Sequence, residues 1–99
     1  VVLHPGTNGT IPEDMMRQML DILKDTPRVV VVNDQMPRTW EQPNNKVIAK
    51  VVPDYPNAVL ADWNKASANH PEYFVSDGIH LTPKGARAYA QLIKKSAGL

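Results

Sequence analysis

An acid and a histidine three positions apart, Asp77 and His80, form the arrangement in this sequence that is best suited to chemistry. They flank a Gly-containing turn that runs directly into Leu81–Gly85, where a helix is expected. Such a turn can place the carboxylate against one imidazole nitrogen and leave the other nitrogen free to act as a general base. The spacing therefore predicts two of the three members of a nucleophilic triad.

The third member of such a triad, a nucleophile, is not evident in the sequence. The chain contains Ser67, Ser76 and Ser96. Ser76 adjoins the acid but does not lie on a strand-to-helix turn, where an activated serine is typically held. Ser67 and Ser96 occur in polar, helix-like contexts, and we expect both to be exposed to solvent. The sequence predicts no nucleophile within this chain.

Two further polar stretches follow predicted strands. Gly6-Thr7-Asn8 follows residues 1–4 after a single proline, and Asp62-Trp63 comes directly after residues 58–61. In an open parallel sheet, ligands bind beyond the carboxyl ends of the strands. We therefore expect these stretches and the Asp77–His80 turn to meet at one edge of the sheet.

Strand and helix signals alternate along the chain, which predicts an α/β fold. Residues 28–33 include four consecutive valines, the pattern of a strand that is covered on both faces in a parallel sheet. Helices between such strands require right-handed crossovers and cover the faces of the sheet. The expected strands are residues 1–4, 28–33 and 58–61, and the expected helices are residues 12–26, 44–52, 65–69 and 82–95.

Composition excludes several classes of protein. The chain has 99 residues, a net charge of +1 and no cysteine, which argues against a nucleic-acid-binding protein, a disulfide scaffold or a thiolate metal site. The longest apolar run, Val29–Val32, is far shorter than the ~20 residues of a membrane span. Because a strand pattern opens the chain and three strands make a thin sheet, we expect residues 1–99 to be the C-terminal part of one larger domain.

The motifs, taken in order, resemble a known family. Gly6-Thr7-Asn8 and the later Asp77–His80 are similar to blocks III and V of the SGNH (GDSL-type) hydrolases. His4–Gly9, Pro37–Trp40, Ala61–Trp63 and Asp77–Gly85 are closer still to the SGNH domains of bacterial O-acyltransferases, which resemble the peptidoglycan O-acetyltransferases. The resemblance covers essentially the whole chain. It implies a three-layer α/β/α, flavodoxin-like fold that is incomplete at its N-terminal side.

The resemblance also implies roles for individual residues. His80 would be the general base, Asp77 would orient it, Asn8 would donate a hydrogen bond to the oxyanion, and Gly6 would allow the loop to approach closely. The serine would precede Val1, so this segment alone would be inactive and would need the N-terminal segment or another chain. The reaction would pass an acyl group from a donor, through an acyl-serine, to a glycan or other hydroxyl acceptor.

The family has a typical context as well. The parent protein would carry a multispanning membrane acyltransferase domain, and this segment would lie on the extracytoplasmic face of the bacterial membrane. No cofactor, metal or nucleic acid is implied.

Other interpretations remain open from the residues alone. Asp77 could simply form an Asx turn with Gly78, beside a histidine that flanks a helix. The loop of residues 6–10 could bind an anion at the start of the following helix, as a non-catalytic small-molecule module would. The spacing of His4, His70 and His80 matches no compact zinc-ligand pattern. Trp40 and Trp63 are expected to pack or to line the rim of a cleft.

Overall fold

The computed structural model describes all 99 residues and contains one sheet of three parallel strands. The strands β1 (Val2–Leu3), β2 (Val29–Val32) and β3 (Ala58–Ala61) lie side by side in that order, so β2 is central. The register places Val30 opposite Val2 on one side and opposite Val59 on the other. The three strands that the sequence predicts are therefore all present.

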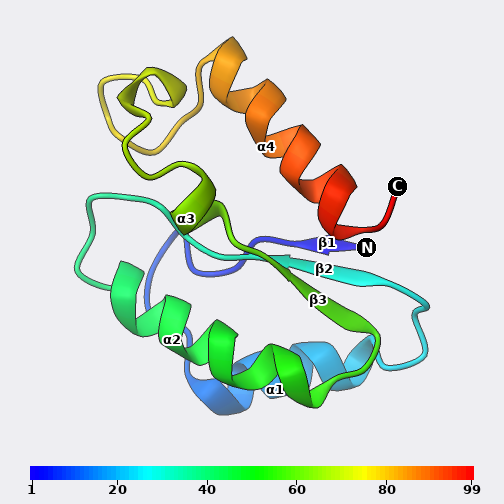
Figure 1. The fold of residues 1–99 in the computed structure, drawn as a ribbon. Helices are drawn as coiled ribbons and strands as arrows, with labels where there is room; N and C mark the ends of the chain where they lie inside the picture. Colours follow the sequence, from blue (N-terminus) through cyan, green and yellow to red (C-terminus); the bar gives the residue numbers. More distant parts are fainter.

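Helices cover both faces of this sheet. Helices α1 (Glu13–Ile22) and α2 (Glu41–Val51) lie on one face, and α3 (Trp63–Ala66) and α4 (Pro83–Ser96) lie on the other (Figure 1). Two short 3₁₀ helices, η1 (Val52–Asp54) and η2 (Pro71–Tyr73), complete the chain. The expected three-layer α/β/α architecture is confirmed. No helix has both the length and the apolar character that crossing a membrane would require.

The four valines of β2 are buried because each face of the sheet has its own core. Val29 and Val31 pack with Met16, Leu20 and Ile48 beneath α1 and α2. Val30 and Val32 pack with Ala61 and Trp63 beneath α4. Burying one such valine contributes on the order of 2 kcal/mol. The continuous valine run thus supports both layers at once.

Helix boundaries differ from the expected ones where local interactions decide them. Helix α2 begins at Glu41, three residues before the predicted start at Asn44, with Pro43 in its first turn, where a missing N–H costs nothing. Helix α1 ends at Ile22, whose side chain is 82% exposed and adds nothing to the core. Helix α3 begins two residues before the predicted Lys65, because the Asp62 carboxylate accepts the Lys65 N–H.

The start of α4 is fixed by a cap and by a close backbone approach. The Thr82 hydroxyl accepts the Gly85 N–H at 3.2 Å and donates to the Glu72 carbonyl at 2.7 Å. A Cβ at Gly85 would lie 2.0 Å from the Tyr73 carbonyl oxygen, so only glycine permits this contact between α4 and η2. Thr82 is therefore the N-cap that the sequence predicts. The turn containing Asp77 and His80 is anchored at its C-terminal end by this arrangement.

Candidate active site

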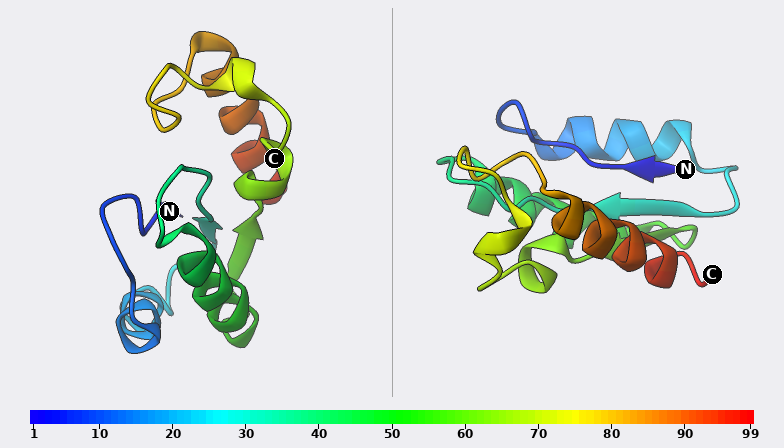
Figure 2. Two further views of the ribbon diagram at one scale, coloured as in Figure 1. Left: turned by 90° about the vertical axis from the view of Figure 1, so that its left-hand side faces the viewer. Right: turned by 90° about the horizontal axis from the view of Figure 1, so that it is seen from above.

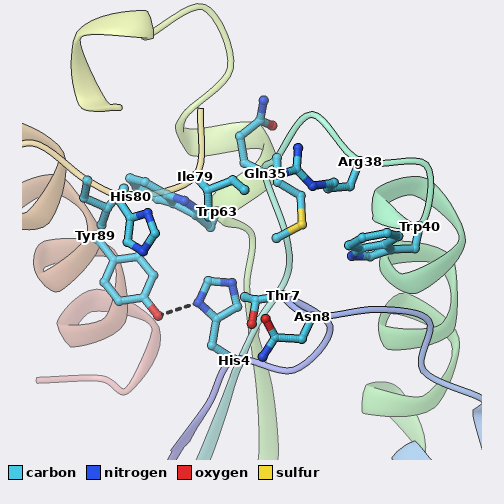
Figure 3. Close-up of a pocket in the computed structure, with 12 residues that line it drawn as sticks. His4, Thr7, Asn8, Gln35, Arg38, Trp40, Trp63, Ile79, His80 and Tyr89 are labelled. Carbon is cyan, nitrogen blue, oxygen red and sulfur yellow. Dashed lines mark hydrogen bonds between the residues drawn. The ribbon is translucent and has the colours of Figure 1, made fainter. Parts of the chain in front are cut away.

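A cavity of about 620 Å³ lies at the carboxyl ends of the strands. The loops after β1 and β2 and the turn before α4 all reach this end of the sheet (Figure 2). Twelve residues from these loops, α3 and α4 line the cavity (Figure 3): His4, Thr7, Asn8, Gln35, Met36, Arg38, Trp40, Trp63, Ile79, His80, Leu81 and Tyr89. Asn8 and His80, 72 positions apart in the sequence, thus face the same space.

Asp77 and His80 form a pair at the rim of this cavity, which we call the rim pair. The Asp77 Oδ2 atom lies 2.5 Å from His80 Nδ1. Asp77 Oδ1 also accepts the backbone N–H groups of Ile79, at 2.8 Å, and His80, at 2.9 Å. The Asx turn and the acid–histidine contact are therefore one structure rather than alternatives. Since Nδ1 is engaged, Nε2 remains available for proton transfer.

These hydrogen bonds favour the charged form of the acid. The bond to the His80 ring, followed by the two backbone N–H bonds, lowers the pKa of Asp77 from its ordinary value of 3.8 to about 2. Both partners are accessible, with side-chain exposures of 80% for His80 and 41% for Asp77. The rim pair therefore presents an ionised acid and an open imidazole at neutral pH.

The loop that carries Asn8 is held from below by a single buried side chain. Asn44 of α2 accepts the Ile11 N–H at 2.8 Å and donates to the carbonyls of Gly9, at 2.8 Å, and Gly6, at 3.3 Å. Gly6 has φ +91°, and a Cβ there would lie 2.6 Å from Asn44 Nδ2. The Asn8 side chain itself makes no hydrogen bond within the chain and lines the cavity. The loop is thus supported by Asn44 and presents the Asn8 side-chain amide to the cavity with no hydrogen-bond partner.

The same contacts occupy one backbone N–H group that an anion in this loop could otherwise use. An anion at the N-terminus of a helix binds free backbone N–H groups. Here the Ile11 N–H, which precedes α1, is already paired with Asn44. The alternative interpretation of residues 6–10 as an anion-binding module has this donor no longer available and stays a prediction.

A second acid–histidine pair, which sequence reasoning missed, lies deeper in the same region. Asp34 follows β2 and is fully buried, and its Oδ1 atom lies 3.2 Å from Nε2 of His4, which follows β1. We call Asp34 and His4 the buried pair. The two atoms are at ion-pair distance but are not aligned as a hydrogen bond, and no other side chain bonds to the Asp34 carboxylate. The sequence feature that could have identified this pair is the acid that directly follows the predicted buried strand.

The buried pair contacts α4 through Tyr89. His4 Nδ1 lies 2.8 Å from the Tyr89 hydroxyl, and the two rings stack with centroids 5.6 Å apart (Figure 3). Burial, and then the negative charge of Asp34, raise the pKa of Tyr89. The hydroxyl therefore stays protonated at neutral pH. His4, which the sequence indicated only as a strand-end residue, thus belongs to the cavity wall.

The three serines lie outside the cavity. Ser67 is buried and donates to the Trp63 carbonyl at 2.6 Å, which corrects the expectation that it is exposed. This hydrogen bond, from the residue that caps α3, satisfies the hydroxyl in its buried position. Ser76 lines a separate, smaller cavity, and Ser96 ends α4. None of them is placed to be activated by His80.

The remaining expected residues have clear positions. Trp63 is buried but contributes to the cavity wall, and Trp40 lines the opposite side. Asp62 does not reach the cavity, because it caps α3 and accepts a hydrogen bond from Asn33 at 2.8 Å. His70 pairs with Glu72 at 2.9 Å instead of approaching the other histidines. The structure contains no cluster of three or more residues with metal-binding side chains.

Comparison with known proteins identifies the relationship that the motifs suggest. No protein-family model matches the chain. It is 39% identical over 93 residues to the peptidoglycan O-acetyltransferase OatA of Listeria monocytogenes, an alignment that covers 94% of this chain and 15% of that protein. It is 41% identical over 96 residues to the O-acetyltransferase OatA of Staphylococcus aureus, covering 97% of this chain and 16% of the relative.

A third relative, the putative peptidoglycan O-acetyltransferase YrhL of Bacillus subtilis, is 36% identical over 93 residues, covering 94% of this chain and 14% of the relative. The chain therefore spans about one sixth of the length of the curated relatives that it matches. These alignments confirm the resemblance to bacterial O-acyltransferases. The chain is homologous to one segment of the bacterial peptidoglycan O-acetyltransferases.

Proposed function

We propose that this chain forms part of an O-acyltransferase active site of the SGNH type, which acts on cell-envelope glycans. The observation that carries the proposal is that His80, oriented by Asp77, faces the same cavity as the free amide of Asn8. Relatives named as peptidoglycan O-acetyltransferases support the substrate class. An acid-oriented base and a fixed hydrogen-bond donor are two of the requirements of acyl transfer through a serine.

In the proposed mechanism, His80 Nε2 takes the proton of a serine hydroxyl as the serine oxygen attacks the carbonyl carbon of the acyl donor. The carbonyl oxygen becomes an oxyanion, and the Asn8 amide donates a hydrogen bond to it. When the intermediate collapses, the bond to the leaving group breaks and His80 returns the proton to that group. An acceptor hydroxyl, deprotonated by His80, then attacks the acyl-serine. The bond between the acyl group and the serine oxygen breaks, and His80 returns the proton to that oxygen.

Gly6 and Asp77 serve these steps without moving protons themselves. Gly6 lets the loop come close to Asn44 and Asp34, so that Asn8 projects into the cavity from a supported backbone. Asp77 keeps the proton of the His80 ring on Nδ1, which leaves Nε2 as the base, and it stabilises the imidazolium that forms.

None of the serines of this chain lines the cavity, which supports a nucleophile from outside residues 1–99. We propose that a segment preceding Val1, or another chain, supplies that serine and that this segment alone is inactive. The parent protein would include a multispanning membrane domain that delivers acyl groups. The site would lie on the extracytoplasmic face of the bacterial membrane, where the glycan acceptors are.

The test uses the intact protein that contains this chain, incubated with a small acetyl ester and quenched during turnover. We expect mass spectrometry of its peptides to find an acetyl group on one serine outside residues 1–99. We expect the modification to be absent in His80→Ala. A histidine away from the cavity, His70, supplies the matched control, and His70→Ala should acetylate normally. Unchanged acetylation in His80→Ala, or none in the wild type, would contradict the proposal.

A further inference from the structure

We propose that Asp34, His4 and Tyr89 are positioning residues, which together hold α4 at the distance from the Asn8 loop that catalysis requires. The inference rests on the proposed function, because it concerns the gap between Asn8 and His80. The three residues form a continuous series of contacts from the end of β2, through the end of β1, to α4.

The first argument is connectivity. Asn8 follows His4 by four residues in the same loop, and His80 lies shortly before the helix that carries Tyr89. The bond between His4 Nδ1 and the Tyr89 hydroxyl is the one hydrogen bond that joins residues 1–12 to α4. The cap and backbone contacts of α4 lead instead to η2. This bond therefore links the segment that carries Asn8 directly to the helix that follows His80.

The second argument is the burial of the acid. A fully buried carboxylate without hydrogen bonds is costly, so a charge or a donor must face it. His4 Nε2, at 3.2 Å, is the group that does so. The negative charge of Asp34 favours a proton on Nε2, which leaves Nδ1 to accept the hydroxyl proton of Tyr89. A histidine held in one tautomer and one orientation makes a defined anchor for the tyrosine.

The third argument is the packing of the anchor. Tyr89 stacks on His4 and meets the buried Trp63 edge to face, with ring centroids 5.3 Å apart. Packing therefore restricts the position of the Tyr89 ring, and the hydrogen bond of its hydroxyl to His4 fixes how the ring is oriented. Removing only the Tyr89 hydroxyl should keep the ring packing and break the hydrogen bond to His4. This separates a positioning role from a general contribution to the core.

The experiment compares Tyr89→Phe with Tyr55→Phe in the intact protein. Tyr55 is a matched control, because its hydroxyl also makes hydrogen bonds, to the Arg17 carbonyl and to Asp21, but it does not line the cavity. For Tyr89→Phe we expect kcat with a small acetyl ester to fall roughly tenfold while KM stays within about twofold, since orientation acts mainly on the chemical step. Tyr55→Phe should match the wild type.

A conservative variant gives a second readout. The side chain of glutamine has one donor group and one acceptor, so His4→Gln can face Asp34 and accept from Tyr89 as the neutral imidazole does. We expect His4→Gln to retain more activity than His4→Ala. Equal activity of these two variants would contradict the proposed pattern of donor and acceptor.

Two measurements that do not depend on activity separate this inference from the proposed function. Nitrogen NMR should find the His4 proton on Nε2, and Tyr89→Phe should shift the Nδ1 resonance. Hydrogen exchange of the α4 amides should accelerate in Tyr89→Phe and not in Tyr55→Phe. Wild-type exchange and wild-type kcat in Tyr89→Phe would overturn the positioning role, even if His80→Ala is inactive. If the wild type cleaves no ester, the proposed function fails and the exchange result alone decides the link.

Discussion

The two acid–histidine pairs of this molecule have the same side chains and opposite surroundings. The rim pair, Asp77 and His80, is local and open, with His80 80% exposed. The buried pair, Asp34 and His4, joins the ends of two strands, with Asp34 fully enclosed and His4 26% exposed. The rim pair keeps one ring nitrogen free, whereas both ring nitrogens of His4 face partners. The comparison suggests that accessibility, rather than residue type, separates a chemical role from an architectural one.

The two pairs should also differ in how much they contribute to the stability of the fold. An exposed pair contributes little to stability, because water screens the charges and solvates each partner alone. A buried carboxylate loses that solvation and depends on the group that faces it. Substitutions in the rim pair should therefore act on activity with little change in stability, whereas substitutions in the buried pair should lower stability as well as activity. The four predictions below test that division.

The largest effect is expected at the rim pair. In the intact protein, His80→Ala should lower the rate of acetyl-ester turnover by about 10⁴-fold, because it removes the proposed general base. Its free energy of unfolding should stay within about 0.5 kcal/mol of the wild type, as is usual for an exposed side chain. Steady-state kinetics and urea unfolding measure the two quantities. A large loss of stability in this variant would erase the contrast with the buried pair.

The next effect is expected at the buried pair and concerns stability. His4→Ala leaves the Asp34 carboxylate buried without a partner, so the free energy of unfolding should fall by about 3 kcal/mol. Adding Asp34→Asn to that variant should recover part of the loss, since a neutral amide costs less to bury than a charge. Urea unfolding of both variants measures this. If the second substitution recovers nothing, the charge of Asp34 is not the cause.

A somewhat smaller effect is expected at the loop between the pairs. Asn8→Ala should reduce turnover by about 100-fold, because one oxyanion donor is removed. Stability should be unaffected, since the Asn8 side chain makes no hydrogen bond in the structure. Asn44→Ala is the informative companion, because it frees the same loop and leaves the Ile11 N–H without its partner. We expect Asn44→Ala to lower both stability and turnover.

The smallest effect is the dependence of stability on pH at the rim pair. The pKa of Asp77 is depressed from 3.8 to about 2, so its contribution to stability is present above pH 4 and is lost as the pH falls toward 2. Asp77→Asn should flatten this part of the curve of unfolding free energy against pH. The same titration of Asp34→Asn serves as the comparison. An unchanged curve in Asp77→Asn would show that the rim contact does not persist in solution.

Features that depend on neighbouring residues could be predicted from the sequence. The contact between Asp77 and His80 spans three positions, and a Gly-containing turn brings the two together in any fold. The four valines of β2 indicated a strand with two covered faces, and Thr82 indicated the start of α4. Boundaries were less predictable. Helix α2 begins at Glu41, where the Glu41 N–H bonds to the Arg38 carbonyl and the Glu41 carboxylate accepts the Met36 N–H, contacts that the apolar pattern of the helix does not reveal.

Local sequence patterns were enough to predict the succession of strands and helices, the rim pair and the edge of the sheet where polar residues meet. Backbone sterics and hydrophobic periodicity act over a few residues, and these features follow from them. The partners of His4 could be identified only in the folded chain, because Tyr89 lies 85 positions away. The folded chain also shows that Asp34 is buried. Such contacts arise when separate elements pack, and the desolvation that accompanies packing is what turns an ordinary acid into a structural constraint.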